Sequence, residues 1–226
     1  MALISAGVGW IGLASAMIGV AAVTRNEPGG GEPPIEDPDA AMVKAVIDGD
    51  PEAYRVLVER YERRIYSVIY GMVRNQEDAR DLAQDAFVKA FQNLHKFRLE
   101  SKFYTWLCRI SMNVAIDHLR KMKHRSHSEF DDNRRASDGA QVVRLSSRRD
   151  NPSENVARKQ VYSNIMAALE MLPDDQRQVV VLRELEGMPY KEIADIIGVP
   201  EGTVMSRLYY ARRRLQELLS AHRPNS

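Results

Sequence analysis

The sequence predicts an all-α protein with two small helical domains joined by a flexible linker, and a helix-turn-helix in the C-terminal domain. Three observations lead to this fold class. Apolar residues recur at three- and four-residue steps over long segments. No stretch alternates apolar and polar residues for long enough to form a useful strand. Segments rich in Pro, Gly, Ser and charge interrupt the helical pattern and separate it into two blocks.

Composition limits the classes of function. With 226 residues, 44% of them hydrophobic and 28% charged, the chain can fold one large or two small domains and is not a disordered tail. Its net charge of +1 means that any contact with nucleic acid must come from local basic patches. A single cysteine, Cys108, excludes an internal disulfide and a four-cysteine zinc site, and it suits a reducing compartment.

The chain divides into five segments in sequence order. We expect a hydrophobic N-terminal segment, a Pro/Gly/acidic linker, a first domain, a second flexible linker and a second domain, at residues 1–24, 25–38, 39–124, 125–152 and 153–221. Residues 2–23 carry no charge and are long enough to span a bilayer. A secretory signal fits them poorly because the charged n-region is absent. A membrane anchor and a misassigned start codon both remain open.

Within the first domain, the segment NQEDARDLAQDAFVKAFQNLHKF predicts a helix with one apolar and one acidic face. The apolar stripe comprises Leu82, Ala83, Ala86, Phe87, Ala90, Phe91 and Leu94. The outer face carries Asp78, Asp81, Gln84, Asp85 and Lys89. Such a face can receive a basic partner, although charged helix faces are more often simply solvated.

The next segment, SKFYTWLCRISMNVAIDHLRKMKHR, combines aromatic and basic residues on one helix. Its core stripe is Phe103, Leu107, Ile110 and Val114, with Tyr104 and Trp106 beside it. The polar residues that point outward or lie downstream are Arg109, Asn113, Arg120, Lys121, Lys123 and Arg125. Aromatic rings stack on unpaired bases while cations follow phosphates, so the pattern favours single-stranded nucleic acid. Taken alone, Trp106 is better explained as a core residue.

The second domain ends in two helices separated by a tight turn. PYKEIADIIG predicts a short helix that starts after Pro189, buries Ile193, Ala194 and Ile197, and ends at Gly198. A longer helix follows, and its apolar stripe is Val204, Leu208, Ala211, Leu215, Leu218 and Leu219. Small Ala194 and the short VPEG turn favour helix-turn-helix geometry over a plain helical hairpin with a solvated basic face. The N-terminal half of the longer helix would then enter the DNA major groove.

Taken together, the three segments DLAQDAFVKAF, FYTWLCRISMNVAIDHLRK and LPDDQRQVVVLRELEGMPYKEIADIIGVPEGTVMSRLYYARRRL resemble the sigma-70 family of bacterial sigma factors, of the two-domain extracytoplasmic-function (ECF) type. The resemblance covers about residues 39–219 and is specific because three motifs agree in order and spacing. It implies a non-catalytic specificity subunit of RNA polymerase that acts in the cytoplasm. Its partners would be core RNA polymerase, promoter DNA and an anti-sigma factor, and it implies no cofactor.

The resemblance also assigns roles to individual residues. The acidic face would dock on the polymerase through Asp81, Gln84 and Asp85. The −10 element would be contacted by Phe97, Arg98, Lys102, Arg109, Asn113, Arg120 and Lys121, with Phe97 and Asn113 capturing a flipped base. The −35 element would be contacted by Arg183, Pro200, Gly202, Thr203, Met205, Ser206, Arg207, Tyr209, Tyr210 and Arg212. Met205 and Tyr210 replace arginines of relatives, so the preferred −35 sequence should differ.

Two alternative functions are also considered. A stand-alone helix-turn-helix regulator that binds operators as a dimer would explain the C-terminal motif but not the acidic and aromatic-basic helices of the first domain. A metal enzyme would need partners for His118, His124 and His127, and the sequence offers no acidic or thiol ligand at regular spacing. For residues 2–23, relatives that begin near DAAMVKAVIDGD place a misassigned start slightly ahead of an anchor. Membrane contact through this segment stays open.

Overall fold

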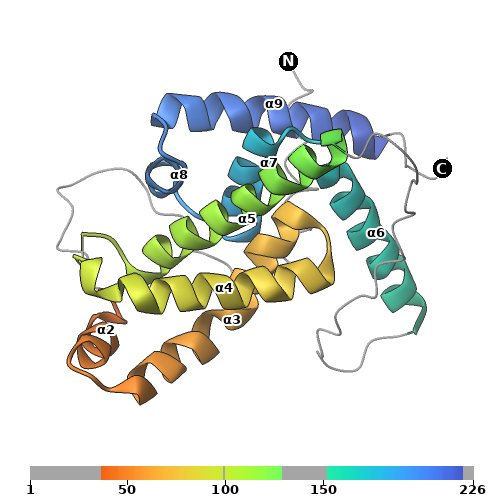
Figure 1. Cartoon of the computed structure of the whole chain (residues 1–226). Coiled ribbons are helices and arrows are strands. Elements are labelled where there is room, and N and C mark those ends of the chain that lie inside the picture. The colour runs from red at the N-terminus through yellow and green to blue at the C-terminus, as the bar shows by residue number, and fades with distance from the viewer. Residues whose placement is uncertain (1–36, 99, 129–151, 221–226) are drawn as a thin grey trace.

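A computed structural model describes residues 37–98, 100–128 and 152–220, and these ranges are helical with no strand among them (Figure 1). The N-terminal half contains α2 (Ala40–Ile47), α3 (Pro51–Val73), α4 (Gln76–Asn93), the short η1 (Leu94–Lys96) and α5 (Phe103–Ser128). The C-terminal half contains α6 (Pro152–Glu170), α7 (Asp174–Val180), the π-helical turn η2 (Val181–Leu185), α8 (Tyr190–Ile197) and α9 (Glu201–Ser220). The predicted all-α class is confirmed.

In the N-terminal half, local capping residues define where the long helices begin. The Asp50 side chain accepts the backbone N–H of Glu52 at 2.9 Å, and Pro51 occupies the first turn of α3. Asn75 caps α4 in the same way, accepting the N–H groups of Glu77 and Asp78. Helices α3, α4 and α5 then pack against one another around a core that includes Leu57, Ile65, Phe87, Phe103 and Leu107.

The start of the described chain is fastened to α5. The Asp37 carboxylate accepts the backbone N–H of Phe103 at 2.8 Å, so it satisfies one of the free donors at the beginning of that helix. Asp39 is buried and accepts hydrogen bonds from the Tyr61 hydroxyl and the Arg60 guanidinium. The sequence assigned Asp37 to a linker, but its side chain is part of the packed structure because it serves a helix 66 residues away.

In the C-terminal half, a buried arginine connects the ends of helices. Arg177 of α7 is 6% exposed and donates to the carbonyls of Leu169, Glu170 and Leu172 at the end of α6. It also donates to the Met72 carbonyl in the last turn of α3 at 2.7 Å. Burial lowers the pKa of this guanidinium. A single side chain therefore donates hydrogen bonds to four carbonyls at or near these helix ends.

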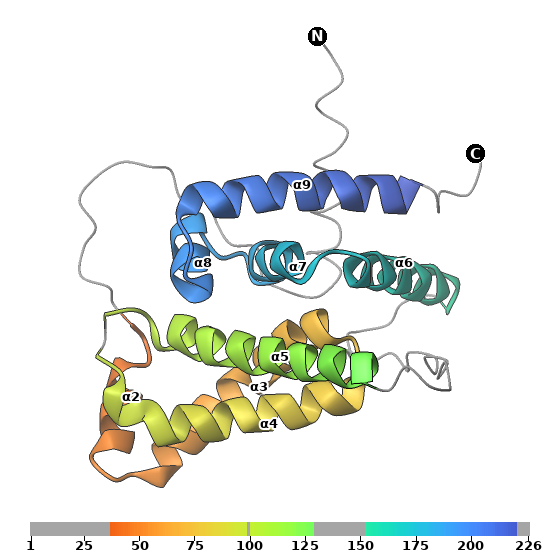
Figure 2. The same ribbon diagram turned by 45° about the horizontal axis from the view of Figure 1, so that its top comes forward.

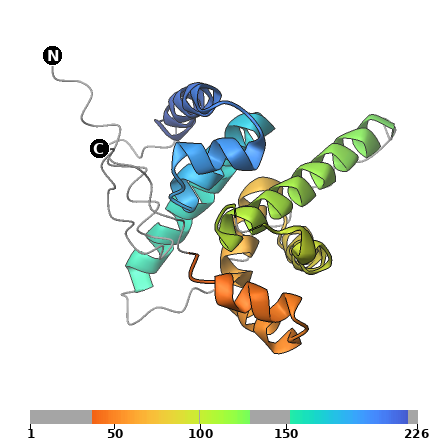
Figure 3. The same ribbon diagram turned by 90° about the vertical axis from the view of Figure 1, so that its left-hand side faces the viewer.

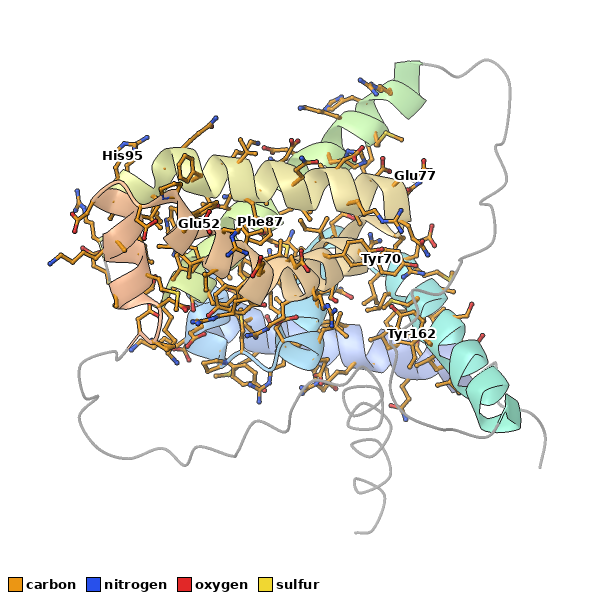
Figure 4. The ribbon with its side chains drawn as sticks, turned by 90° about the horizontal axis from the view of Figure 1, so that it is seen from below. Glu52, Tyr70, Glu77, Phe87, His95 and Tyr162 are labelled. Atoms are coloured by element: carbon orange, nitrogen blue, oxygen red, sulfur yellow. The ribbon has the colours of Figure 1, made fainter. Side chains whose placement is uncertain are left out.

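The two halves lie as adjacent layers, with α3, α4 and α5 on one side and α7, α8 and α9 on the other (Figure 2). The side view separates the same layers and shows α5 extending beyond the C-terminal half (Figure 3). Gly71 of α3 lets the layers approach, because a Cβ atom there would lie 2.9 Å from Cγ2 of Val181. Tyr162 of α6 lies near the end of α3 that carries Tyr70 (Figure 4).

Some predicted segments fall partly or wholly outside the described residues. Residues 1–36, with the hydrophobic N-terminal segment and most of the first linker, lie outside them, as do residues 129–151 of the second linker. Helix α5 continues to Ser128, four residues past the predicted end of the first domain at residue 124. Among the helices that the structure describes, none is long and apolar enough to cross a membrane.

The arginine that joins the helix ends predicts a large stability effect. Replacing Arg177 with Met (Arg177→Met) should lower the free energy of unfolding by about 3 kcal/mol, since it removes a buried guanidinium that donates hydrogen bonds to four carbonyls. Urea denaturation followed by circular dichroism measures the change. The exposed Arg213→Met, which removes the same charge, should change stability by less than about 0.5 kcal/mol. Equal effects of the two substitutions would contradict the assignment.

Candidate docking and nucleic-acid surfaces

The outward face of α4 is acidic and accessible. Asp81, Gln84 and Asp85 are all exposed, and they lie opposite the buried side of the helix, which consists of Ala79, Leu82, Ala83, Ala86, Phe87 and Ala90. The cause is the helical period: the apolar residues turn toward α3 and α5, which leaves the carboxylates facing solvent. The three predicted docking residues are thus presented together on one face.

The structure adds three details about the side chains of α4. The sequence placed Phe91 in the apolar stripe, but its side chain is 50% exposed and packs at one edge against Tyr54, with ring centroids 4.9 Å apart. Val88 is also about half exposed, at 49%. Asp78 is turned toward α5, where its carboxylate lies 3.4 Å from Nε2 of His118. The face therefore combines carboxylates with apolar side chains.

Helix α5 separates its core stripe from a polar side as the sequence predicts. Phe103, Leu107 and Val114 are buried, while Ile110 is half-buried. Arg98 and Lys102, which precede the helix, and Arg109, Asn113, Arg120 and Lys121 along it are all exposed. Arg109 donates to the backbone carbonyl of Asp195 in α8 at 2.6 Å. Four of the predicted −10 residues therefore face the C-terminal half, namely Lys102, Arg109, Asn113 and Arg120.

Phe97 is placed differently from the other −10 candidates. Its side chain is 8% exposed and packs against Phe103 and Trp106, with ring centroids 6.1 and 5.2 Å away. Trp106 itself is half-buried and belongs to this aromatic cluster. Sequence reasoning identified the residue but not its burial, which depends on how η1 folds back over the start of α5. In this conformation the Phe97 ring is a core group.

The helix-turn-helix forms between α8 and α9 with the predicted boundaries. Pro189 precedes α8, and Gly198 ends it in the left-handed region at φ 71°, donating its N–H to the Ala194 carbonyl. Val204 is fully buried in the angle between the helices, and Leu208, Ala211 and Leu215 continue the buried stripe of α9. This stripe fixes α9 to the domain, so its opposite face is free.

The free face of α9 carries most of the predicted −35 residues. Met205, Ser206, Tyr209 and Tyr210 are exposed, and the two tyrosine rings meet edge to face with centroids 5.3 Å apart. Pro200 and Gly202 are exposed in the turn and first helical turn, and Thr203 is half-buried. Such a helix can present side chains to a groove about 12 Å wide, the width of the DNA major groove.

The arginines assigned to the −35 surface are held by other groups of the same domain. Arg207 lies 3.2 Å from the Asp175 carboxylate, and Arg212 makes two hydrogen bonds to Glu184 at 2.6 and 3.0 Å. Arg183 donates to the Met188 carbonyl and stacks on the Tyr190 ring. These contacts order the guanidinium groups around α9 before any partner binds.

Charged residues that sequence reasoning did not single out meet where the two halves touch. Glu186 is 6% exposed and accepts hydrogen bonds from Arg64 of α3, at 2.9 and 3.1 Å, and from the Tyr104 hydroxyl. Arg64 also lies 3.8 Å above the Tyr104 ring. Burial raises the pKa of Tyr104 well above its usual value. Glu186 lies just before Gly187 at the end of a helix, and the apolar periodicity of the sequence does not indicate that its side chain is buried.

The described part of the chain offers no group of three or more His, Cys, Asp or Glu side chains that could hold a metal ion. His118 is paired with Asp78. Cys108 is fully buried, and burial raises its thiol pKa, which disfavours the reactive thiolate. The described residues present three exposed surfaces, namely the acidic face of α4, the basic side of α5 and the outer face of α9.

Comparison with known proteins finds a family match in each half of the chain. The family model for sigma-70 region 2 matches residues 57–125, and that for sigma-70 region 4 matches residues 162–215. RNA polymerase sigma-H factor from Pseudomonas aeruginosa is 34% identical over 186 residues, which cover 81% of this chain and 95% of the relative. ECF RNA polymerase sigma-E factor from Escherichia coli K12 is 36% identical over 180 residues, covering 78% and 92%.

Solved structures give the same fold. CnrH in complex with the cytosolic domain of CnrY has a TM-score of 0.59 at 24% identity, over 82% of this chain and 99% of that one. The sigma factor RpoE in complex with the anti-sigma factor NepR from Bartonella quintana also has a TM-score of 0.59, at 26% identity over 75% and 98%. Because both region models match in order and the relatives align over nearly their whole length, the chain belongs to the sigma-70 family of RNA polymerase sigma factors, in the extracytoplasmic-function group.

Proposed function

We propose that this chain is a promoter-specificity subunit of RNA polymerase, in which the N-terminal half docks on the core enzyme and opens the −10 element while α9 binds the −35 element. The observation that carries the proposal is the presence of three separate surfaces on one chain: an acidic face on α4, a basic side on α5 and an exposed helix-turn-helix. A dimeric operator-binding regulator would use only the third. The chain adds no catalytic step, and RNA synthesis stays with the core enzyme.

Docking on the core enzyme uses the exposed face of α4. Asp81 and Asp85 are one turn apart, with Gln84 beside them, so a basic helix of the polymerase can pair with both carboxylates. Val88 continues the same face by one further turn and adds apolar area to the contact. Opposite charge then guides the encounter, and the apolar side chain contributes to the lifetime of the complex.

Recognition of the −10 element uses the basic side of α5. Asn113 offers both a donor and an acceptor to a base edge, whereas Arg98, Lys102, Arg109, Arg120 and Lys121 offer cations to phosphates. Stacking of a flipped base on Phe97 requires the ring to leave its contacts with Phe103 and Trp106. We therefore assign base reading at this element first to Asn113.

Recognition of the −35 element uses the exposed face of α9. Met205, Ser206, Tyr209 and Tyr210 face outward near the helix N-terminus, while Arg207 and Arg212 flank them. Methionine cannot form the bidentate pair by which arginine reads guanine, so apolar contact with thymine methyl groups should weigh more here. The preferred −35 sequence should shift accordingly.

Partners and location follow from the same assignment. RpoE of Bartonella quintana was solved with an anti-sigma factor, and we extend that kind of partner to this chain. A subunit that acts on the core enzyme and chromosomal DNA works in the cytoplasm, and this applies whether or not residues 2–23 touch a membrane.

Charge reversal on α4 should separate docking from folding. The double variant Asp81→Arg/Asp85→Arg should lose binding to purified core polymerase by at least about 100-fold, because two attractive pairs become repulsive. Its melting temperature should stay close to that of the parent, since both positions are exposed. Asp48→Arg/Glu62→Arg makes the same change of net charge at exposed positions away from this face and should bind normally. Normal binding by the first variant would refute the docking surface.

Asn113→Ala should lose base discrimination in the −10 element. We expect a loss of about 1–3 kcal/mol in open-complex stability, the usual size of one base-specific contact. Abortive transcription from a duplex template and from one with a pre-melted −10 bubble, with the base varied at the flipped position, measures it. Binding to a −35 duplex should not change, and the exposed amide variant Gln216→Ala serves as control. Equal discrimination by Asn113→Ala and the parent would rule the contact out.

A chain that begins at Glu36 should direct transcription in solution to within about twofold of the full chain, because Asp37 is the first residue that the structure ties to α5. Run-off transcription with purified core polymerase measures this, with both chains at equal concentration. Loss of activity in the shorter chain would show that residues 1–35 take part in initiation.

A further inference from the structure

The outer face of the first half of α9 is apolar and aromatic. Helix α9 lies at the outer edge of the C-terminal half (Figure 2). Its side chains Met205, Tyr209 and Tyr210 are 49%, 63% and 57% exposed. Among the residues that the structure describes, they are three of eight exposed large hydrophobic side chains, and they fall within six consecutive positions. Apolar area concentrated in this way marks a surface that contacts a partner.

These side chains share one side of the helix. Met205 and Tyr209 are one helical turn apart, and Ser206 and Tyr210 form the next row beside them. The two tyrosine rings meet edge to face, with centroids 5.3 Å apart. The buried stripe that fixes α9 to the domain lies on the opposite side of the helix. We call the surface formed by Met205, Tyr209 and Tyr210 the aromatic face.

The arginines around the aromatic face are engaged by other groups of the same domain. The Nε atom of Arg207 lies 3.2 Å from the Asp175 carboxylate. Arg212 donates to Glu184 through both Nε and Nη2, at 3.0 and 2.6 Å. A guanidinium held in this way keeps N–H groups for a phosphate, but bidentate reading of guanine needs two free donors on the same edge. These arginines are therefore better placed to contact the DNA backbone than to read bases.

The polar atoms of the face discriminate poorly between bases. The Ser206 hydroxyl already donates to the Thr203 carbonyl at 3.0 Å. The hydroxyls of Tyr209 and Tyr210 each donate and accept, so either kind of base edge satisfies them. The thioether of Met205 is only a weak acceptor. What the face offers selectively is apolar contact, with cations at its border for phosphates.

In the DNA major groove, the methyl group at C5 of thymine is the apolar group that a protein can read. A methyl group added to C5 of cytosine occupies the same position in the groove. The two bases then differ at C4, where thymine has an acceptor and cytosine a donor. A tyrosine hydroxyl accommodates both, because it can reverse its role in the hydrogen bond.

We propose that the aromatic face reads the C5-methyl group of pyrimidines, so that α9 accepts 5-methylcytosine in place of thymine and responds to methylation of cytosine in its DNA site. Met205 and Tyr209 supply the methyl contact, and Tyr210 extends the apolar wall beside them. The proposal rests on the proposed function, because it takes from that function the placement of α9 in the major groove of the −35 element.

The size of the effect follows from the apolar area of one methyl group. Its burial changes affinity by about fourfold, so two contacted methyl groups change it by more than about tenfold. Contacts with phosphates are the same whether or not the base is methylated. The methyl effect should therefore persist at higher salt, and the dependence of binding on salt concentration should not change.

Chemically edited DNA tests the proposal. The full chain, in complex with purified core polymerase, first selects its best site from a library of randomised duplexes, with core polymerase alone as the reference. The −35 element of that site is then synthesised with uracil at single thymine positions, with cytosine, or with 5-methylcytosine. Fluorescence anisotropy measures the affinity of each duplex. The same edits made outside the element are the control and should leave affinity unchanged.

Uracil at a contacted position should weaken binding by about fourfold, since it lacks only the methyl group of thymine. Cytosine at that position should bind at least about threefold more weakly than 5-methylcytosine. Equal affinity for the thymine and uracil duplexes at every position of the element would overturn the proposal. If the chain with core polymerase selects no site beyond those of core polymerase alone, the proposed function fails and the methyl contact fails with it.

Variants of the aromatic face assign the effect to its apolar atoms. Met205→Gln, which is polar and of similar length, should reduce the preference for thymine over uracil by at least about threefold, whereas Met205→Leu should keep it. Tyr209→Phe and Tyr210→Phe should also keep it, because the rings remain. Gln216→Leu, at an exposed position three turns along α9, is the matched control and should behave as the parent. All five positions change exposed or edge atoms, so melting temperatures should stay close to that of the parent.

Two outcomes would contradict this assignment. Loss of the thymine preference in the phenylalanine variants would show that the hydroxyls read the base. An unchanged preference in Met205→Gln would show that the apolar side chain faces a partner other than DNA. Either result would overturn the proposed methyl contact while leaving −35 binding by α9 intact.

Discussion

The arrangement of the two halves depends on the buried carboxylate of Glu186. A charge with so little exposure is costly unless donors surround it, and here the guanidinium of Arg64 and the hydroxyl of Tyr104 supply them. Both donors come from the other half of the molecule, since Arg64 belongs to α3 and Tyr104 to α5, whereas Glu186 follows η2. This contact, together with the shared apolar core, fixes the C-terminal half against α3 and α5.

Small residues at two positions allow the helices around this carboxylate to pack closely. Gly71 removes a side chain where η2 meets α3, and Ala194 lets α8 sit against its neighbours. Arg177 then uses its planar group to connect the end of α6 with the end of α3. Because apolar and polar contacts share one surface, loosening either kind loosens both, which gives the interface the all-or-none character of a packed core.

The sequence was sufficient for the local part of the fold. The helix-turn-helix was predictable because Pro189, Gly198 and the stripe from Val204 to Leu215 encode start, stop and buried face within a short stretch. The acidic face of α4 followed from the same periodicity. Phe91 did not, because a neighbour in another helix, Tyr54, decides its exposure. Residue periodicity can say which face is apolar, but not which rings at its edge are covered.

Contacts between distant residues could not be predicted in this way. Arg64 and Glu186 are 122 residues apart, and Asp37 serves a helix 66 residues further on. Nothing in the local sequence of Glu186 distinguishes it from a solvated acid. The burial of Phe97 is similar, since it depends on the return of the chain after η1 and not on the HKFRLES motif that identified it. For the base contacts proposed on α5 and α9, the structure shows where the side chains lie and how exposed they are.

Because Arg64 and Glu186 are far apart along the chain, they also become available at different times during synthesis. A ribosome that adds about 5–20 residues per second needs roughly 6 to 24 s to travel the 122 residues between them. During that interval α4 and α5 are completed, and with α3 they can fold on local contacts while Glu186 does not yet exist. A newly made chain therefore passes through an open form by necessity. Its acidic face on α4 is complete before the carboxylate that shuts the molecule has been synthesised.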